Sequence, residues 1–203
     1  WSPFTENRII NKYWWHTSDY SLGFVAGYGV HYVDIAQWGN NTERRGPIAV
    51  SGSGVFPSEG LCDCAIRWNV TLTYENGVRM IYTDTETTPE GITVEGDAGR
   101  VYVTLGRVET EPKDLLKTVL GPDDVHLYES NHHVRNFLDC VKSRAQTRVS
   151  ADVACQSHIA CHAGNIALFL NRKVQYDPVK NVFIGDDEAN RLRSEALREP
   201  WRI

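Results

Sequence analysis

The feature of this sequence that most constrains its fold is a stretch in which side chains alternate with a period of two. It runs from residue 47 to residue 105 and is clearest where apolar side chains take every second position: Ile66, Trp68, Val70, Leu72 and Tyr74. That period indicates strands with one buried face. Asn76-Gly77 and Gly96-Asp97-Ala98-Gly99 predict tight hairpin turns. The stretch is therefore predicted to form about five strands in a meander, which implies a largely antiparallel sheet.

Helical periodicity flanks the sheet on both sides. Before it, a mostly buried helix is expected over residues 24–38, ended by Gly39-Asn40. After it, three helices are expected over residues 133–144, 151–171 and 186–196. Asn131 is the expected N-cap of the first of these three. The order predicts an α+β fold, with one open, largely antiparallel sheet and helices on one of its faces.

Composition limits the class of protein and of partner. Of the 203 residues, 41% are hydrophobic and 23% are charged, as in an ordinary globular protein. A net charge of −5 offers no basic stripe to a nucleic acid, and no polybasic run suggests a membrane surface. In the first forty residues the longest stretch without a charged side chain, Tyr20–Val33, is too short to span a bilayer. We expect a single domain over residues 1–203, made of an aromatic lead-in at 1–22, the helix at 23–38, the sheet at 47–105, and helices with a C-terminal tail at 131–203.

The start of the chain and its cysteines bear on origin and compartment. The chain opens at Trp1 and its one methionine is Met80, so we expect a fragment or a processed chain. No charged segment followed by an apolar one marks a signal peptide. The five cysteines are odd in number and scattered, which favours free thiols in a reducing compartment. The expected location is the cytoplasm, with export as the alternative because a targeting segment would lie upstream.

The strongest candidate for chemistry lies within residues 29–38. On a helix His31, Asp34 and Trp38 share one face, because they are spaced by three and seven residues. A carboxylate one turn from a histidine fixes one tautomer and raises its proton affinity, as a general acid or base requires. Gly27 and its neighbouring glycines let a ligand or another backbone approach. The alternative is a buried helix in which the two polar side chains only satisfy each other or nearby loops.

Aromatic residues gather in the first 38 positions, which hold four of the six tryptophans. The cluster comprises Tyr13, Trp14, Trp15, His16, Tyr20, Tyr28, Tyr32 and Trp38. Aromatic faces beside hydrogen-bonding groups suit a sugar, whose faces are apolar and whose rim carries hydroxyls. The alternative is an interface that another part of the protein covers, and both can hold together.

The spacing of cysteines, histidines and glycines bears on two further kinds of site, a metal site and a nucleotide site. Cys155, His158, Cys161 and His162 share one expected helix, but a single helix rarely supplies a tetrahedral zinc set. Core packing is the preferred interpretation, no metal is predicted, and a zinc hydrolase on Cys155 and His158 is the last alternative. Cys62 and Cys64 lack a matching second pair. No glycine-rich turn joins an expected strand to a helix, so this chain is not expected to bind a dinucleotide.

Five blocks of the chain form an ordered set. They are Asp19–Gly23 leading into Gly29–Gly39, then His133–Arg144, Cys161–Ala167, Asp187–Asn190 and Arg198–Trp201. This set, with its G-x-H-x-x-D motif, resembles the C-terminal domain of the glucose–fructose oxidoreductase and inositol dehydrogenase family, also written Gfo/Idh/MocA. The resemblance covers nearly the whole chain. It implies an open sheet with helices on one side, similar to the C-terminal domain of dihydrodipicolinate reductase.

The resemblance also implies a function. Family members are two-domain oxidoreductases that use NAD or NADP on sugars, polyols and related compounds. Their N-terminal Rossmann domain holds the cofactor, and the C-terminal domain supplies the substrate pocket and commonly the oligomer interface. By this similarity His31 matches the family's catalytic-site histidine, which binds or deprotonates the reacting hydroxyl. With the helix-face argument, the match predicts that His31 is the acid or base or the substrate anchor. The residues expected to line or orient the pocket are Trp15, His16, Asp19, Tyr28 and Asp34. The expected partners are a carbohydrate-like substrate, the missing Rossmann domain and further copies of the chain.

Two departures from the family pattern limit this inference. The Rossmann domain and its lysine are absent, so the isolated chain should be inactive and should bind no NAD. Many family dehydrogenases carry an aspartate four residues before the histidine, where this chain has Gly27. Asp34 and Asp19 are the remaining candidate carboxylates. The alternatives are therefore a catalytically lapsed sugar-binding or scaffold protein and a relative that recycles NAD while cleaving glycosides.

Overall fold

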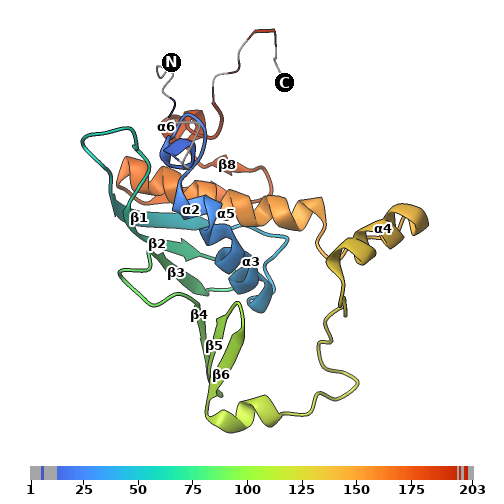
Figure 1. Cartoon of the computed structure of the whole chain (residues 1–203). Helices are drawn as coiled ribbons and strands as arrows, with labels where there is room; N and C mark the ends of the chain where they lie inside the picture. Colours follow the sequence, from blue (N-terminus) through green and yellow to red (C-terminus); the bar gives the residue numbers. More distant parts are fainter. Residues whose placement is uncertain (1–5, 7–12, 196, 198, 201–203) are drawn as a thin grey trace. The chain divides into compact units, whose positions relative to one another are not determined.

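The computed structural model describes residues 6, 13–195, 197 and 199–200. Much of the aromatic lead-in and part of the Arg198–Trp201 block lie outside these residues. The chain divides into a larger unit, Trp1–Pro89 with Gln156–Ile203, and a smaller unit, Glu90–Cys155. Helices and antiparallel sheets make up both (Figure 1), which confirms the predicted α+β class. No helix in the described part of the chain is long and apolar enough to cross a membrane.

The larger unit is built on a five-stranded antiparallel sheet in the order β3-β2-β1-β7-β8. Its strands are β1 (Ala49–Val55), β2 (Arg67–Thr73), β3 (Arg79–Thr83), β7 (Val174–Asp177) and β8 (Val182–Phe183). Gly77 sits in the turn between β2 and β3 at φ 85°, where glycine carries no strain, so the predicted Asn76-Gly77 hairpin is confirmed. Strands β7 and β8 were not predicted, because each is too short for an alternation of period two to be recognised in the sequence.

Helix α5 (Ala151–Leu170) crosses one face of this sheet from Gln156 onward (Figure 1). Glycines allow the close approach: a Cβ on Gly164 would lie 3.3 Å from Cγ1 of Val70, and one on Gly52 would lie 3.0 Å from Cδ2 of Leu168. Val70 is fully buried in this layer. The other face of the sheet is open, with Ile81 62% exposed. The prediction of helices on one face holds for this unit.

The helix expected over residues 24–38 is interrupted at Tyr28, which separates α2 (Phe24–Gly27) from α3 (Gly29–Gly39). The Tyr82 hydroxyl of β3 causes the break, because it donates to the backbone oxygen of Val25 at 2.6 Å. It also lies so close to Gly29 that any Cβ there would overlap it. Helix α3 ends at Gly39, as predicted, but most of its side chains are partly or fully exposed, so the expectation of a mostly buried helix was wrong.

The smaller unit carries a three-stranded antiparallel sheet. Its strands are β4 (Ile92–Gly96), β5 (Gly99–Thr104) and β6 (Arg107–Glu111), and η2 (Lys113–Lys117) follows. Gly96 pairs with Gly99, which confirms the second predicted hairpin. The single predicted meander is therefore divided between two sheets, and β6 extends beyond residue 105. The division follows β3, where the buried Asp84 carboxylate accepts hydrogen bonds from the backbone of Glu86 and Thr87 and fixes a turn.

Helix α4 (His133–Ser143) also belongs to the smaller unit, close to its predicted bounds. Its N-cap is His132 and not Asn131, because the His132 ring accepts from the backbone N–H of Arg135 at 3.1 Å. An imidazole nitrogen thus satisfies one of the free N–H groups that every helix start exposes.

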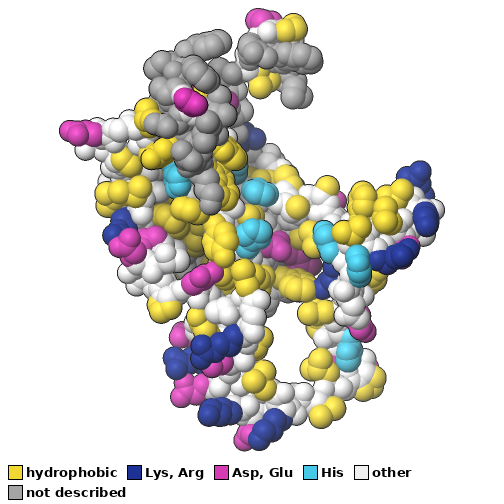
Figure 2. Space-filling view, in the orientation of Figure 1, with side chains coloured by type: hydrophobic (Ala, Val, Ile, Leu, Met, Phe, Trp, Pro, Cys, Tyr) yellow, Lys and Arg dark blue, Asp and Glu magenta, His cyan; other side chains and the backbone are white. Residues whose placement is uncertain are grey.

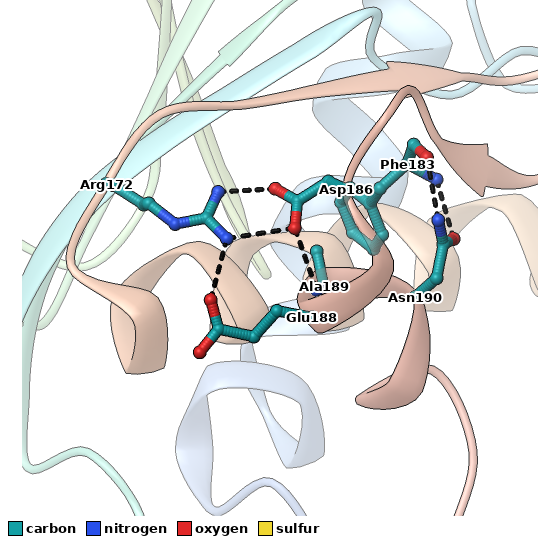
Figure 3. A network of polar contacts seen from close by, with 6 residues as sticks. All are labelled: Arg172, Phe183, Asp186, Glu188, Ala189 and Asn190. Carbon is teal, nitrogen blue, oxygen red and sulfur yellow. Dashed lines mark hydrogen bonds and ion pairs between the residues drawn. The ribbon is translucent and has the colours of Figure 1, made fainter.

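Helix α6 (Asp187–Arg191) is shorter than the predicted 186–196 and is fixed by a polar network (Figure 3). The Asp186 carboxylate caps it by accepting from the N–H of Ala189 at 3.0 Å, and it pairs with both terminal nitrogens of the Arg172 guanidinium. The Asn190 side chain donates to the oxygen of Phe183 at 2.7 Å and accepts from its N–H at 2.9 Å. The Asp187–Asn190 block therefore has a structural role, which is to fasten α6 to β8.

Candidate functional site

His31 lies in the first turn of α3, directly after the break at Tyr28. Its backbone N–H donates to the oxygen of Tyr28 at 3.2 Å, and the two rings meet edge to face with centroids 5.7 Å apart. Tyr32 contacts the same Tyr28 ring at 5.9 Å. The His31 side chain is exposed, so this arrangement fixes the start of the helix and leaves the imidazole open to a ligand.

Asp34 is half-buried and is held by another element. Its Oδ1 accepts from the hydroxyl of Ser157 on α5 at 2.5 Å. No hydrogen bond joins Asp34 to His31 within the described residues. The expected pairing of the two side chains is therefore not formed, and the carboxylate is positioned by the core instead.

The indole of Trp15 covers the position at which many family members carry an aspartate. A Cβ on Gly27 would lie 2.5 Å from Nε1 of Trp15, so no side chain fits at residue 27 beside this indole. Trp15 comes from η1 (Tyr13–His16) and also packs on Phe24 with ring centroids 5.7 Å apart. Trp14 stacks on Trp15 at 6.0 Å and is 45% exposed. The two tryptophans thus form an accessible aromatic surface beside α2.

His16 ties η1 to a distant loop. Its backbone oxygen accepts from the N–H groups of Asp63 at 3.0 Å and Cys64 at 3.2 Å, and its ring packs on Phe24 at 4.9 Å. The half-buried ring therefore lies beside the aromatic surface. Asp19 lies in the exposed turn after η1, and nothing in the described part of the chain links its carboxylate to His31.

These placements gather the predicted residues around α2 and the start of α3. In the space-filling view, hydrophobic side chains and histidines lie side by side over these elements (Figure 2). Phe24, 43% exposed, links Trp15 to His16 and was not predicted to belong to the site. Neither was Ser157, which lies on α5. Gln37, a polar residue near the end of the largely apolar helix α3, was a sequence signal for a buried polar partner.

The metal-ligating side chains and the glycine turn before α6 bear on the metal and cofactor predictions. No group of three or more His, Cys, Asp or Glu side chains within the described residues could hold a metal ion. Burial raises the pKa of the Cys161 thiol to about 12, so it remains protonated and is a poor ligand. A glycine, Gly185, does lie between β8 and α6, but the Asp186 carboxylate caps that helix, where it would repel a pyrophosphate. These residues do not fit a dinucleotide.

A separate hollow lies on the smaller unit. It has a volume of about 560 Å³ and is lined by Thr93, Arg100, Tyr102, Glu109, Thr110, Glu111 and Lys113. Arg100 pairs with Glu111 at 2.7 Å, and the Tyr102 hydroxyl donates to the oxygen of Glu90 at 2.6 Å. Arg100 and Glu111 thus pair within the lining, and the hollow contains none of the candidate site residues.

A family model described as "Oxidoreductase family, C-terminal alpha/beta domain" matches residues 1–203. No curated protein sequence matches the chain significantly.

Several solved structures share the fold at low sequence identity. The WlbA dehydrogenase from Bordetella pertussis, in complex with NADH and UDP-GlcNAcA, is 16% identical with a TM-score of 0.60, over 87% of this chain and 52% of that one. The UDP-N-acetylglucosamine 3-dehydrogenase GnnA from Acidithiobacillus ferrooxidans is 12% identical with a TM-score of 0.53, over 84% and 53%. An aldose-aldose oxidoreductase from Caulobacter crescentus, complexed with glycerol, is 12% identical with a TM-score of 0.50, over 79% and 50%. The chain spans about half the length of these proteins.

Proposed function

Because this chain belongs to the Gfo/Idh/MocA oxidoreductase family, as its C-terminal alpha/beta domain, we propose that it is the substrate-binding and assembly domain of an NAD(P)-dependent oxidoreductase. The proposed substrate is a sugar, a polyol or a related compound. The observation that carries the proposal is the exposed His31 imidazole at the start of α3, four residues after Gly27, against which the indole of Trp15 packs.

The chemistry assigned to this chain is binding and proton transfer. A sugar ring stacks on the exposed aromatic faces through its C–H groups. His31 then takes the proton of the reacting hydroxyl during oxidation and returns it during reduction. The hydride chemistry belongs to a nicotinamide, which we assign to a separate dinucleotide domain of the whole protein.

The choice of substrate class rests on site chemistry and on fold neighbours. One neighbour is named as a UDP-N-acetylglucosamine dehydrogenase, and another is a dehydrogenase in complex with UDP-GlcNAcA. A third is named as an aldose-aldose oxidoreductase. At such low identity the shared fold does not carry the substrate with it. We therefore propose the class of hydroxyl-bearing carbohydrates and not one compound.

The test uses the whole protein with NAD and NADP and a panel of sugars, sugar nucleotides and polyols. We expect turnover on at least one compound, and His31→Ala should lower kcat/KM by about 10²–10⁴-fold, the usual contribution of a general acid or base. His126, an exposed histidine of the smaller unit, provides the matched control His126→Ala, which should leave turnover unchanged. If His31→Ala turns over the substrate as fast as wild type, His31 does not transfer the proton of the reacting hydroxyl.

A catalytically lapsed sugar-binding protein is the second candidate, and the packing of Trp15 on Gly27 is the observation in its favour. Such a protein binds members of the same panel by calorimetry but changes no NADH. A glycoside-cleaving relative that recycles its cofactor would release sugar, also without net change in NADH. Product analysis separates these two outcomes.

Assembly is proposed through the open face of the five-stranded sheet. Ser53, Asn69 and Ile81 lie exposed there, on the face opposite the one that α5 covers. Arg67, Asn69, Thr71 and Thr73 alternate along β2 on this face, and such polar but β-prone side chains suit a broad interface with a second copy of the chain. The five cysteines are free thiols in the structure, in keeping with the cytoplasm as the proposed compartment.

A further inference from the structure

Three hydrogen bonds run through the larger unit and end on Asp34. The Tyr74 hydroxyl donates to Oε1 of Gln37 at 3.0 Å, and Nε2 of Gln37 donates to Oγ of Ser157 at 3.3 Å. Ser157 donates in turn to Oδ1 of Asp34 at 2.5 Å. We call this chain of four residues the Asp34 relay. It joins the end of β2, helix α3 and helix α5, which lie far apart in the sequence.

The relay is buried almost to its end. Tyr74, Gln37 and Ser157 are each no more than 1% exposed, whereas Asp34 is half-buried. A polar group in such a place destabilises the fold unless it is hydrogen-bonded, and apolar side chains would fill the same volume without that risk. The three buried residues therefore call for an explanation beyond packing.

The direction of the relay supplies that explanation. Burial raises the pKa of Tyr74, so the phenol keeps its proton and donates. Each following group accepts from the one before it and donates to the next, so every donor points toward the carboxylate. Hydrogen bonds aligned in this way polarise one another. The relay engages Oδ1 of Asp34 and leaves Oδ2, the second carboxylate oxygen, outside it.

We propose that Gln37 and Ser157 are positioning residues, which hold Asp34 so that its Oδ2 accepts a hydrogen bond from a substrate hydroxyl next to the one on which His31 acts. Side chains three residues apart on a helix have their Cβ atoms roughly 5–6 Å apart, a spacing that suits two hydroxyls of one small molecule. The substrate class narrows to compounds with neighbouring hydroxyls. The inference rests on the proposed function for the role of His31.

The test compares variants of the whole protein in two measurements. The first is the steady-state kinetics with the compound that the panel identifies. Ser157→Ala should raise KM about tenfold and leave kcat within about twofold, because it removes a hydrogen bond to a carboxylate that binds the substrate. Ser157→Thr keeps the hydroxyl and should restore KM. Tyr74→Phe, at the far end, should raise KM by less.

Tyr176→Phe is the matched control for Tyr74→Phe. Tyr176 is a buried tyrosine of the same unit, 4% exposed, whose hydroxyl donates to Oδ1 of Asn181 at 3.2 Å, off the relay. The second measurement is the carboxyl ¹³C chemical shift of Asp34, assigned by its loss in Asp34→Asn. It should move in Ser157→Ala and Tyr74→Phe and stay in place in Tyr176→Phe.

The outcomes separate this inference from the proposed function. If the protein turns over a sugar but Ser157→Ala behaves like Tyr176→Phe, the relay has no role in binding and the inference is overturned while the function stands. If no compound turns over, the proposed function fails, and with it the substrate-binding role of the relay. In that case, if the Asp34 signal moves in Ser157→Ala, the relay still positions the carboxylate although its role in substrate binding is lost. If the signal does not move, the relay does not position Asp34 either.

Discussion

The indole of Trp15 lies directly on the Cα of Gly27, and a Cβ at residue 27 would come within 2.5 Å of Nε1. The position of the indole therefore depends on residue 27 being a glycine. A carboxylate four residues before His31 requires that the indole move away, and the indole in turn requires that residue 27 have no side chain. Gly27, at the position where many family members carry an aspartate, is thus packed against Trp15.

We predict that Gly27→Asp and Trp15→Ala are coupled. Gly27→Asp alone should lower the free energy of unfolding by about 1–3 kcal/mol, because it overpacks the contact. With Trp15→Ala already present, the added cost of the aspartate should be smaller, since the space is then open. Urea unfolding of the two single variants and the double variant measures the coupling, and strictly additive effects would contradict the contact.

A second prediction concerns the break between α2 and α3. Gly29→Ala places a methyl group against the Tyr82 hydroxyl and should destabilise the fold strongly. Tyr82→Phe removes that hydroxyl and leaves the oxygen of Val25 without this donor, at a cost of about 1–2 kcal/mol. The double variant should recover part of the Gly29→Ala loss in urea unfolding. A double variant no better than Gly29→Ala would show that the hydroxyl is not the obstacle.

A third prediction follows from the network around α6. The hydrogen bonds from Arg172 lower the pKa of the Asp186 carboxyl to about 2, below its ordinary value of 3.8. A group whose pKa is lower in the folded state stabilises the fold above its unfolded pKa and loses that effect as the pH falls through its folded pKa. Asp186→Asn should therefore lower the melting temperature at pH 7, and the difference from wild type should shrink between pH 4 and about 2.

Asp187→Asn is the control for this measurement, because Asp187 lies in the first turn of the same helix and is exposed. Its removal should change the melting temperature less at pH 7. An Asp186→Asn difference that stays constant from pH 7 to pH 2 would show that the ion pair with Arg172 does not account for the effect.

The fourth prediction concerns assembly. If the open sheet face joins two copies, Ile81→Lys should lower the mass measured by light scattering toward that of a monomer, because it puts a charge into an apolar contact. Val179→Lys is a control, since Val179 is 88% exposed and lies outside the strands. A wild-type protein that is already monomeric at high concentration would refute the proposed interface.

The alternation from Ile66 to Tyr74, the turn at Asn76-Gly77 and the helix stop at Gly39 are local signals, so the sequence alone determined strand β2, the first hairpin and the α+β class. Three features depended on contacts between distant residues. The break at Tyr28 depends on a hydroxyl from β3. The turn that divides the two sheets depends on Asp84, whose carboxylate also accepts from the backbone N–H of Trp68 on β2, and the partner of Asp34 is Ser157, more than a hundred residues away along the chain.

His31 illustrates the same division within the site. Its spacing from Asp34 predicted a shared helix face, which follows from helix geometry alone. Spacing cannot determine which neighbour a carboxylate bonds, because that depends on which helix packs beside it. The sequence predicted which residues carry the chemistry, whereas the packing of α5 and η1 against α2 and α3 decided that Asp34 bonds to Ser157 and that Trp15 fills the space beside Gly27.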